Sequence, residues 1–216
     1  MDKVKLVWVT PDADNLVASM ARVSAPENQK KYESAPRLIS YLIKHQHWSP
    51  FEMVSACMEI DTSRDIGRQL LRHRSFSFQE FSQRYASVRA LPEGTLREAR
   101  LQDHKNRQNS IETDDDVLHR DWEFRQQQML SLARTHYDWA LDNGIAKEVA
   151  RAILPEGLTP SRLYMAGTLR SWIHFCALRR GNGTQKEAKE IADKVWEILT
   201  FACPMVCFAW EKHRED

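Results

Sequence analysis

The sequence predicts an α+β fold: a central, mostly antiparallel sheet flanked by helices, with one long helix and a small helical part. Two patterns lead to this prediction. Short β-rich or alternating stretches mix irregularly with amphipathic stretches of helical period, an order typical of α+β domains. The 216 residues are also 42% hydrophobic, enough for one sizeable core, so we expect a single domain over residues 1–216.

Strand and helix signals follow one another in the first half of the chain. Residues 51–60 are interpreted as a strand of which both faces are covered. A helix capped by Ser63 should follow and end near Arg72. Residues 92–113 have little apolar periodicity and should form surface loops. The other elements expected here are a strand at 4–9, a helix at 15–23, a helix from Ser34 and Pro36 to about His45, and a loop or short strand at 75–90.

Helical patterns dominate the second half. Asp114 or Asp115 should cap a long helix, whose expected core residues include Trp122, Met129 and Tyr137. The elements expected after it are a helix at 145–154 that stops at Pro155, a strand at 158–167, a helix at 168–178, a loop at 181–183, and a C-terminal helix that Pro204 kinks or restarts.

Charge and composition narrow the class of protein. Lys plus Arg total 31 against 30 Asp plus Glu, a balance that argues against broad nucleic-acid binding. No apolar run reaches the roughly 20 residues that a membrane helix needs. The first residues also lack the apolar region of a signal peptide, so we expect no membrane association and a cytoplasmic setting. Four scattered cysteines predict no disulfide framework.

An arginine cluster before residue 75 is the first candidate for chemistry. Arg68 and Arg72 are four residues apart on the predicted helix, and Gln69 and Arg72 are three apart, so each pair shares a face. One interpretation is a set of cations that favour a helix C-terminus. The other is a group of guanidiniums that bind the phosphate or carboxylate oxygens of a small anionic ligand.

Other candidate groups favour packing or binding over metal or covalent chemistry. His45 and His47 have no acidic or Cys ligands nearby, and Cys203 and Cys207 need further ligands to hold a metal, so we expect no metal site. Ser82 has no evident basic partner, which favours a binding role over nucleophilic catalysis.

Four ordered segments of the chain carry a recognisable pattern. The stretch RHRSFSFQEFSQRY contains Arg-His-Arg, then seven residues, then Ser82, and it resembles the signature of the flavin-dependent thymidylate synthases. Gln185 and Glu187 fit what usually follows the last segment. The other three segments are KHQHWSPFE at 44–52, KEVARAILP at 147–155 and LRSWIHFCALR at 169–179. Four segments in order across most of the chain are far more specific than one motif.

The resemblance implies an activity, its partners and an assembly. Members of the family form dTMP from dUMP with FAD as cofactor, 5,10-methylenetetrahydrofolate as one-carbon donor and NADPH as reductant. They are homotetramers with active sites at subunit interfaces. The sequence has no G-x-G-x-x-G fingerprint, since Gly181-Asn182-Gly183 lacks the third glycine and a preceding strand. FAD would therefore be held by arginines and interface packing rather than by a Rossmann fold.

Residue roles also follow from the resemblance. Arg179 would be the catalytic residue, because a permanent cation beside the uracil N3–H lowers the pKa of that group. Its role would be electrostatic, since an arginine stays protonated. The residues implied to bind FAD are His47, Ser49, Arg72, His73, Arg74, Glu80, Thr168, Leu169, Arg170 and His174. Those implied to bind dUMP are Gln69, Arg72, Glu80, Phe81, Ser82, Gln83, Arg84, Arg151 and Arg179.

Some residues depart from the family pattern. Met53, Gln79 and Thr168 stand where other residues are common, which leaves details of the flavin geometry open but not the reaction. Two functions of other classes remain open. One is a nucleotide- or RNA-binding protein that uses the arginine clusters without catalysis. The other is a phosphohydrolase, for which the sequence shows no convincing metal-binding carboxylate cluster.

Overall fold

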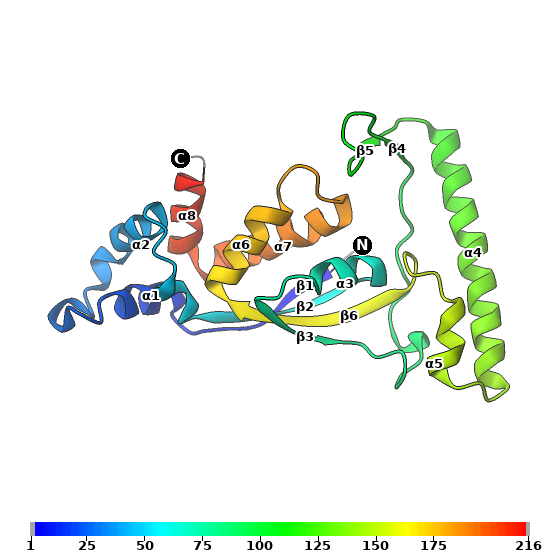
Figure 1. The fold of residues 1–216 in the computed structure, drawn as a ribbon, viewed down its shortest axis with the longest axis horizontal. Coiled ribbons are helices and arrows are strands. Elements are labelled where there is room, and N and C mark those ends of the chain that lie inside the picture. The colour runs from blue at the N-terminus through cyan, green and yellow to red at the C-terminus, as the bar shows by residue number, and fades with distance from the viewer. Residues whose placement is uncertain (1–2, 215–216) are drawn as a thin grey trace.

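A four-stranded antiparallel sheet forms the centre of the molecule. The computed structural model describes residues 3–214, and Figure 1 shows the sheet running across it with helices above the sheet and at both ends. The strand order is β1-β2-β6-β3, and all three strand pairs are antiparallel. The strands are β1 (Lys3–Val9), β2 (Ser55–Ser63), β3 (Phe76–Glu80) and β6 (Pro160–Thr168). The predicted α+β fold with an antiparallel sheet is confirmed.

The two central strands, β2 and β6, pair along their whole length, from Ser55 opposite Thr168 to Ser63 opposite Pro160. Successive side chains of a strand point to opposite faces, so each strand contributes alternate residues to one core face. The buried apolar residues on this face are Ala56, Met58, Ile60, Leu163 and Met165. This face carries the main hydrophobic core.

The opposite face of the same two strands is polar. Arg162 donates to both carboxylate oxygens of Asp61 at 2.6 and 3.0 Å. Tyr164 donates to Glu59 at 2.8 Å. Of the two strand faces that we expected to be covered, only one therefore carries the apolar core.

Helices cover the apolar face. α3, α6 and α7 lie over the sheet, and α1, α2 and α8 pack at one end of it (Figure 1). Trp172 of α6 is fully buried, and its Nε1 donates to the carbonyl of Ala56 at 3.1 Å, which fixes the helix layer to β2. The bounds of these helices are α1 (Ala13–Ala21), α2 (Ala35–Lys44), α3 (Arg64–Leu70), α6 (Leu169–Arg179), α7 (Lys186–Ala202) and α8 (Pro204–His213).

The long helix α4 (Asp116–Asp142) stands at the other end of the sheet, beside the short α5 (Lys147–Ala150) (Figure 1). The predicted cap is confirmed, because the carboxylate of Asp115 accepts from the amides of Val117 and Leu118, both at 3.0 Å. Tyr137 is buried as expected, in a small cluster with residues of α5.

The expectation that Trp122 and Met129 belong to the core is wrong. Their side chains are 42% and 56% exposed. The physical reason is that α4 meets the rest of the chain along one face only, since its buried residues are Gln126, Ala133, Tyr137 and Ala140. Helical periodicity gives the apolar face of a helix but not the partner that covers it.

Three local details differ from the sequence prediction. The strand expected at 51–60 begins only at Ser55, because Ser49–Glu52 forms a 3-10 turn, η3, around Pro50. The hydroxyl of Ser63 donates to Asp65 instead of capping α3. The stretch 92–113 is mostly loop but contains a small hairpin of β4 (Arg100–Gln102) and β5 (Ser110–Glu112).

Two further observations concern the cysteines and the helices. Cys57, Cys176, Cys203 and Cys207 are all free and buried. Over residues 3–214, no helix has the length and apolar character that crossing a membrane requires.

The pairing of β6 with β3 generates a prediction at Gly167, which lies opposite Phe76. A Cβ at Gly167 would overlap the Phe76 ring, and that ring packs against Trp172 with centroids 4.6 Å apart. We expect Gly167→Ala to lower the free energy of unfolding by about 1–3 kcal/mol, measured by urea denaturation. Gly157→Ala is the control, since its Cβ would lie 3.9 Å from Asp65. Equal stability of the two variants would contradict the prediction.

Candidate active site

The residues after α3 form a tight polar turn. The amide of His73 donates to the carbonyl of Leu70 at 3.0 Å, and the amide of Phe76 donates to the carbonyl of His73 at 3.2 Å. These bonds turn the chain from α3 directly into β3. The turn therefore holds three consecutive basic side chains, those of Arg72, His73 and Arg74, between a helix and a strand.

Arg179, the last residue of α6, contacts this turn and α3 itself. Its Nε donates to Nε2 of His73 at 2.9 Å, and its Nη2 donates to the backbone carbonyl of Gln69 at 3.2 Å. The structure thus brings together the predicted catalytic residue and two predicted binding residues. We call Gln69, Arg72, His73, Arg74 and Arg179 the α3–α6 cluster.

The contact with Arg179 fixes the protonation of His73. A guanidinium only donates hydrogen bonds, so Nε2 of His73 must accept and the ring proton must lie on Nδ1. Burial and the positive charge of Arg179 both lower the pKa of His73, from 6.5 to about 4. His73 is therefore neutral near pH 7 and can act as an acceptor for Arg179.

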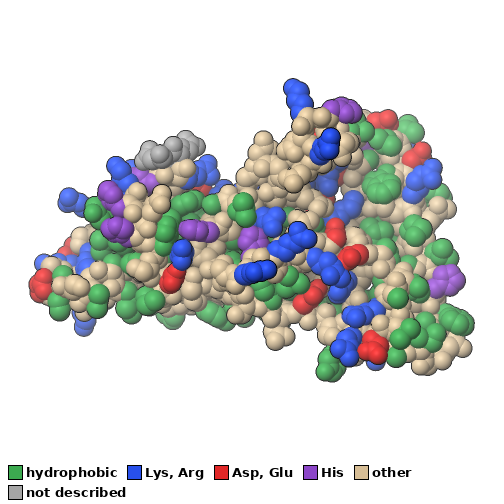
Figure 2. Space-filling view, viewed as in Figure 1, with side chains coloured by type: hydrophobic (Ala, Val, Ile, Leu, Met, Phe, Trp, Pro, Cys, Tyr) green, Lys and Arg blue, Asp and Glu red, His purple; other side chains and the backbone are tan. Residues whose placement is uncertain are grey.

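The guanidiniums of the α3–α6 cluster have no carboxylate partner among the residues that the structure describes. Burial and the neighbouring charge of Arg72 both lower the pKa of Arg179, although an arginine remains protonated. Among residues 3–214, neither Arg72 nor Arg74 forms an ion pair. Figure 2 shows Lys, Arg and His side chains gathering over the middle of the molecule, on the face seen in that view. Such an arrangement suits an anionic ligand, which would offset the repulsion between the guanidiniums.

The first half of α6 packs against the segment around η3. Arg170 forms an ion pair with Glu52, and the ring of His174 lies edge-on to Trp48 with centroids 4.7 Å apart. The same helix also reaches the polar turn, because the hydroxyl of Ser171 donates to the carbonyl of Ser75 at 3.2 Å. The predicted FAD residues Arg170 and His174 of α6 therefore lie between the 44–52 segment and the polar turn after α3.

Other predicted FAD residues are less free to meet a ligand. Oγ1 of Thr168 accepts from the amide of Ser171 at 3.3 Å and so caps α6. The side chain of Leu169 is 2% exposed and lies in the core, so only its backbone could contact FAD. His47 packs near Tyr41 with ring centroids 6.0 Å apart, and Ser49 begins η3.

A cavity of about 780 Å³ opens beside His174. Its wall includes the rings of Trp48 and Trp210 and the side chains of Lys44 and Arg214. Aromatic rings next to cations suit a large ligand with planar and anionic parts. These residue types suit FAD, because its rings need apolar walls and its pyrophosphate needs cations.

A second basic group lies at the other end of the sheet. Nε of Arg84 contacts Oε2 of Glu148 at 3.1 Å, and Nε of Arg151 donates to the carbonyl of Glu148 at 3.3 Å. We call Arg84, Glu148 and Arg151 the α5 cluster. α5 lies beyond the end of the sheet next to α4, whereas α6 lies over the sheet (Figure 1). Within the described part of the chain, no hydrogen bond or ion pair links the α5 cluster to Arg179.

The predicted substrate residues between these clusters lie at the end of β3 and just after it. Oε1 of Glu80 accepts from the hydroxyl of Ser161 at 2.8 Å and lies 3.6 Å from Arg64. Gln83 is only 3% exposed, and within residues 3–214 its Nε2 has no hydrogen-bond partner. An unpaired buried donor is costly, and a ligand oxygen would satisfy it. Phe81 and Ser82 are half-buried.

Four residues that contact the predicted site were not assigned a role from sequence. Trp48 and Glu52 hold His174 and Arg170, Glu148 holds Arg84, and Gln185 accepts from Nε2 of Gln69 at 2.7 Å. Trp48, Glu52 and Glu148 lie inside recognised motifs, and Gln185 lies six residues after the end of the last one. The motif positions were therefore the available signal, but only the contacts give these residues a function.

Comparison with known proteins identifies the family. The model of the family described as "Thymidylate synthase complementing protein" matches residues 5–205. A probable flavin-dependent thymidylate synthase of Paramecium bursaria Chlorella virus 1 is 48% identical over 197 residues, which is 91% of this chain and 90% of the viral protein. The chain belongs to the flavin-dependent thymidylate synthase family.

Two more relatives agree with this assignment. The flavin-dependent thymidylate synthase of Synechocystis is 46% identical over 200 residues, covering 92% of this chain and 89% of the relative. A crystal structure of the UMP/dUMP methylase PolB from Streptomyces cacaoi, bound with 5-Br dUMP, superimposes with a TM-score of 0.85 at 30% identity, covering 98% of this chain and 95% of PolB. As predicted from sequence, the chain is a flavin-dependent thymidylate synthase, a methyltransferase that uses FAD and forms dTMP from dUMP.

The protonation of His73 can be tested directly. We expect its ring to titrate with a pKa of about 4 when followed by NMR of labelled histidine, because burial and Arg179 oppose protonation. Arg179→Ala should raise this pKa toward 6.5. Arg180→Ala is the matched control, since Arg180 pairs with Asp193 and Glu211 instead. An unchanged titration in Arg179→Ala would show that Arg179 does not act on His73.

Proposed function

We propose that this thymidylate synthase uses 5,10-methylenetetrahydrofolate as one-carbon donor and NADPH as reductant, and works as a homotetramer with active sites between subunits. One observation supports an active site that two subunits share. The residues that match the family's dUMP motifs form two separate clusters in a single chain. A neighbouring subunit that brings its α5 cluster against the α3–α6 cluster would complete one site.

The surface of α4 supports assembly with other subunits. Trp122, Phe124, Leu132 and Trp139 are 42%, 60%, 54% and 60% exposed. Large exposed apolar side chains on one element are typical of an interaction surface, since their burial is favourable. α4 also stands next to α5, so contacts made through α4 would position the α5 cluster relative to another subunit.

FAD would be held by residues from three parts of the chain. Arg72, Arg74 and Arg170 would offset the charge of the pyrophosphate. The side chains that would add hydrogen bonds are those of His47, Ser49, His73, Glu80, Thr168 and His174, while Leu169 would contribute only its backbone. When bound, FAD carries the electrons that the reductive methylation requires.

The phosphate of dUMP would meet the α5 cluster. A nucleotide phosphate carries about two negative charges near pH 7, so it competes well with Glu148 for Arg84. Arg151 and the hydroxyl of Ser82 would bind the same oxygens, with Phe81 and Gln83 beside them. Gln69 and Arg72 of the other subunit would then contact the rest of the nucleotide.

Arg179 would act on the uracil ring. Its guanidinium keeps its charge and cannot serve as a base. Placed beside N3, it lowers the pKa of the N3–H, and an ionised ring is richer in electrons at C5, where the new carbon attaches. Neutral His73 orients Arg179 through the 2.9 Å hydrogen bond without adding a competing charge.

Removing the cation should separate chemistry from cofactor binding. We expect Arg179→Ala to lower the rate of dTMP formation by about a hundredfold or more, since an electrostatic group in the transition state is lost. Bound flavin, measured by absorbance, should be unchanged. Arg68→Ala is the control, because Arg68 is an exposed arginine that pairs with Glu156. Turnover at the wild-type rate in Arg179→Ala would remove Arg179 from the mechanism.

The shared site makes a second prediction, based on mixed oligomers. Arg84→Ala and Arg179→Ala should each be nearly inactive alone. After the two variants are unfolded together and refolded, about a quarter of the sites would combine an intact α5 cluster with an intact α3–α6 cluster by random assortment. Activity assays should therefore recover a comparable share of wild-type turnover. If mixing restores nothing in correctly assembled oligomers, the two clusters do not belong to one intersubunit site.

A further inference from the structure

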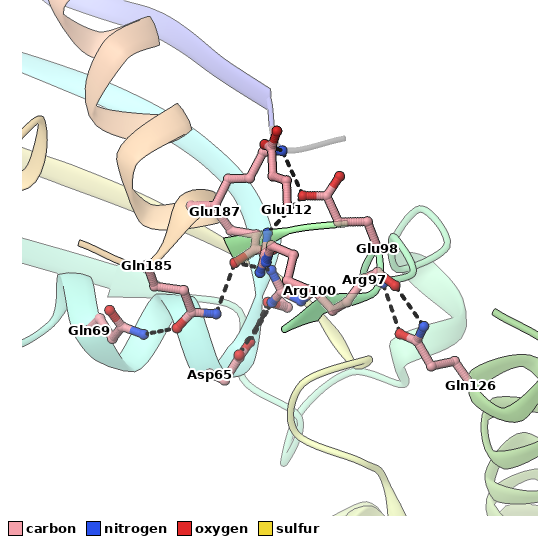
Figure 3. Close-up of polar contacts among 11 residues, drawn as sticks. Asp65, Gln69, Arg97, Glu98, Arg100, Glu112, Gln126, Gln185 and Glu187 are labelled. Carbon is pink, nitrogen blue, oxygen red and sulfur yellow. Dashed lines mark hydrogen bonds and ion pairs between the residues drawn. The ribbon is translucent and has the colours of Figure 1, made fainter. Parts of the chain in front are cut away.

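The side chain of Gln69 is held by a residue from another helix. Its Nε2 donates to Oε1 of Gln185 at 2.7 Å. Gln185 is the N-cap residue of α7, yet its side chain makes no hydrogen bond to the amides of that helix. Side chains at this position usually satisfy those amides. Figure 3 shows the Gln185 side chain directed instead between Gln69 on one side and Glu187 on the other.

The far end of this chain of contacts is a half-buried carboxylate. Nε2 of Gln185 donates to Oε2 of Glu187 at 2.9 Å. Arg97 contacts Oε2 of Glu187 at 3.1 Å, and Arg100 contacts Oε1 at 2.7 Å. Burial alone would raise the pKa of Glu187, but Arg97, a backbone amide, Arg100 and Gln185 together lower it. Glu187 is therefore an ionised, acceptor-only group at neutral pH.

We call the hydrogen-bonded chain Gln69–Gln185–Glu187 the relay. Arg97 makes the Glu187 end of the relay rigid. Its Nη2 donates to Oδ1 of Asp65 at 3.0 Å. Its backbone amide donates to Oε1 of Gln126 at 2.8 Å, and Nε2 of Gln126 donates back to its carbonyl at 2.7 Å. Glu187 is thus anchored to α3 through Asp65 and to α4 through Gln126 (Figure 3).

The chemistry of Glu187 dictates the direction of every bond in the relay. A carboxylate has no proton to donate, so Gln185 must turn its NH₂ group toward it. The oxygen of Gln185 is then left for Gln69, and Gln69 must donate through its own NH₂ group. The carbonyl Oε1 of Gln69 consequently remains free, and among the described residues it has no hydrogen-bond donor.

We propose that Gln185 and Glu187 are positioning residues that set which end of the Gln69 amide faces the nucleotide. The inference rests on the proposed role of Gln69 in binding dUMP and deepens it. With the relay intact, Gln69 offers the nucleotide a carbonyl oxygen, which pairs with an N–H or O–H of dUMP. Without the relay, the amide can rotate by half a turn and present its NH₂ group to that same donor.

The relay also reaches the α3–α6 cluster. The backbone carbonyl of Gln69 accepts from Nη2 of Arg179 at 3.2 Å. Gln69 therefore stands between a fixed carboxylate on one side and the proposed catalytic cation on the other. A defect in the relay should show in nucleotide binding first, because Arg179 contacts the backbone of Gln69 and not its side chain.

The test is a double-mutant cycle on the FAD-loaded enzyme, read by calorimetric titration with dUMP. Gln185→Met keeps the length of the side chain but removes both hydrogen bonds. We expect it to raise the dissociation constant of dUMP about five- to tenfold, as for the loss of one oriented hydrogen bond. In a Gln69→Met background, the same change should have no further effect. Flavin content and the thermal midpoint should match the wild type.

Two more variants complete the experiment. Glu98→Gln is the matched control, because Glu98 pairs with Lys186 and Arg100 at the rim of the same ionic group but does not touch Gln185. It should leave dUMP binding unchanged. Gln185→Asn is a milder version that keeps the amide but shortens its reach, and it serves if Gln185→Met fails to fold. Its dissociation constant should rise in the same direction.

The outcomes separate the relay from the proposed function. If Gln69→Met weakens dUMP binding and Gln185→Met does not, the relay is wrong and the dUMP site stands. If Gln185→Met weakens binding equally in both backgrounds, its role is structural and the positioning proposal fails. If Gln69→Met itself leaves dUMP binding unchanged, then the proposed role of Gln69 in the dUMP site fails, and the relay loses its function with it.

Discussion

The guanidinium of Arg179 joins two helices that are far apart in the sequence, and the candidate active site depends on this contact. One nitrogen reaches His73 in the turn after α3, and another reaches the backbone of α3 at Gln69. Both acceptors are neutral, and the positive charge of Arg72 acts together with burial to lower the pKa of Arg179. A half-buried cation without a carboxylate is poorly compensated by the protein alone. An anionic or easily ionised ligand would supply the missing compensation.

The sheet makes that contact possible. β2 and β6 pair over their whole length, and the chain enters α3 directly after β2 and α6 directly after β6. Both helices then lie on the apolar face, where Trp172 is buried against β2. Because the other face carries mainly polar side chains, most of the hydrophobic driving force for packing acts on one side. The helices that carry Gln69 and Arg179 are therefore pressed into the same layer and meet at their C-terminal ends.

The division of the binding residues into two clusters has a simple structural origin. α4 and α5 form their own small core around Tyr137 and lie beyond the end of the sheet. Arg84 and Arg151 belong to this part, whereas Arg72 and Arg179 belong to the helix layer. In the proposed homotetramer, another subunit would cover the exposed apolar side chains of α4. Assembly and catalysis would then be linked. The interface that buries α4 would also bring Arg84 and Arg151, proposed to bind the phosphate, close to Arg179 of another subunit, proposed to act on the uracil ring.

The sequence by itself determined the family, the α+β class and most elements, because motifs and hydrophobic periods are local properties of the chain. An aspartate cap of α4 was predicted at Asp114 or Asp115, and the structure selects Asp115. Arg72, His73 and Arg74 were expected at the end of a helix, but α3 ends at Leu70 and these residues form a turn. Only the folded structure decided that Trp122 and Met129 are exposed, since a period does not reveal which surface covers a helix. It also decided that Arg179 contacts His73 and that the side chain of Gln69 donates to Gln185. These contacts join residues more than a hundred positions apart, and no local pattern in the sequence records the distance between them.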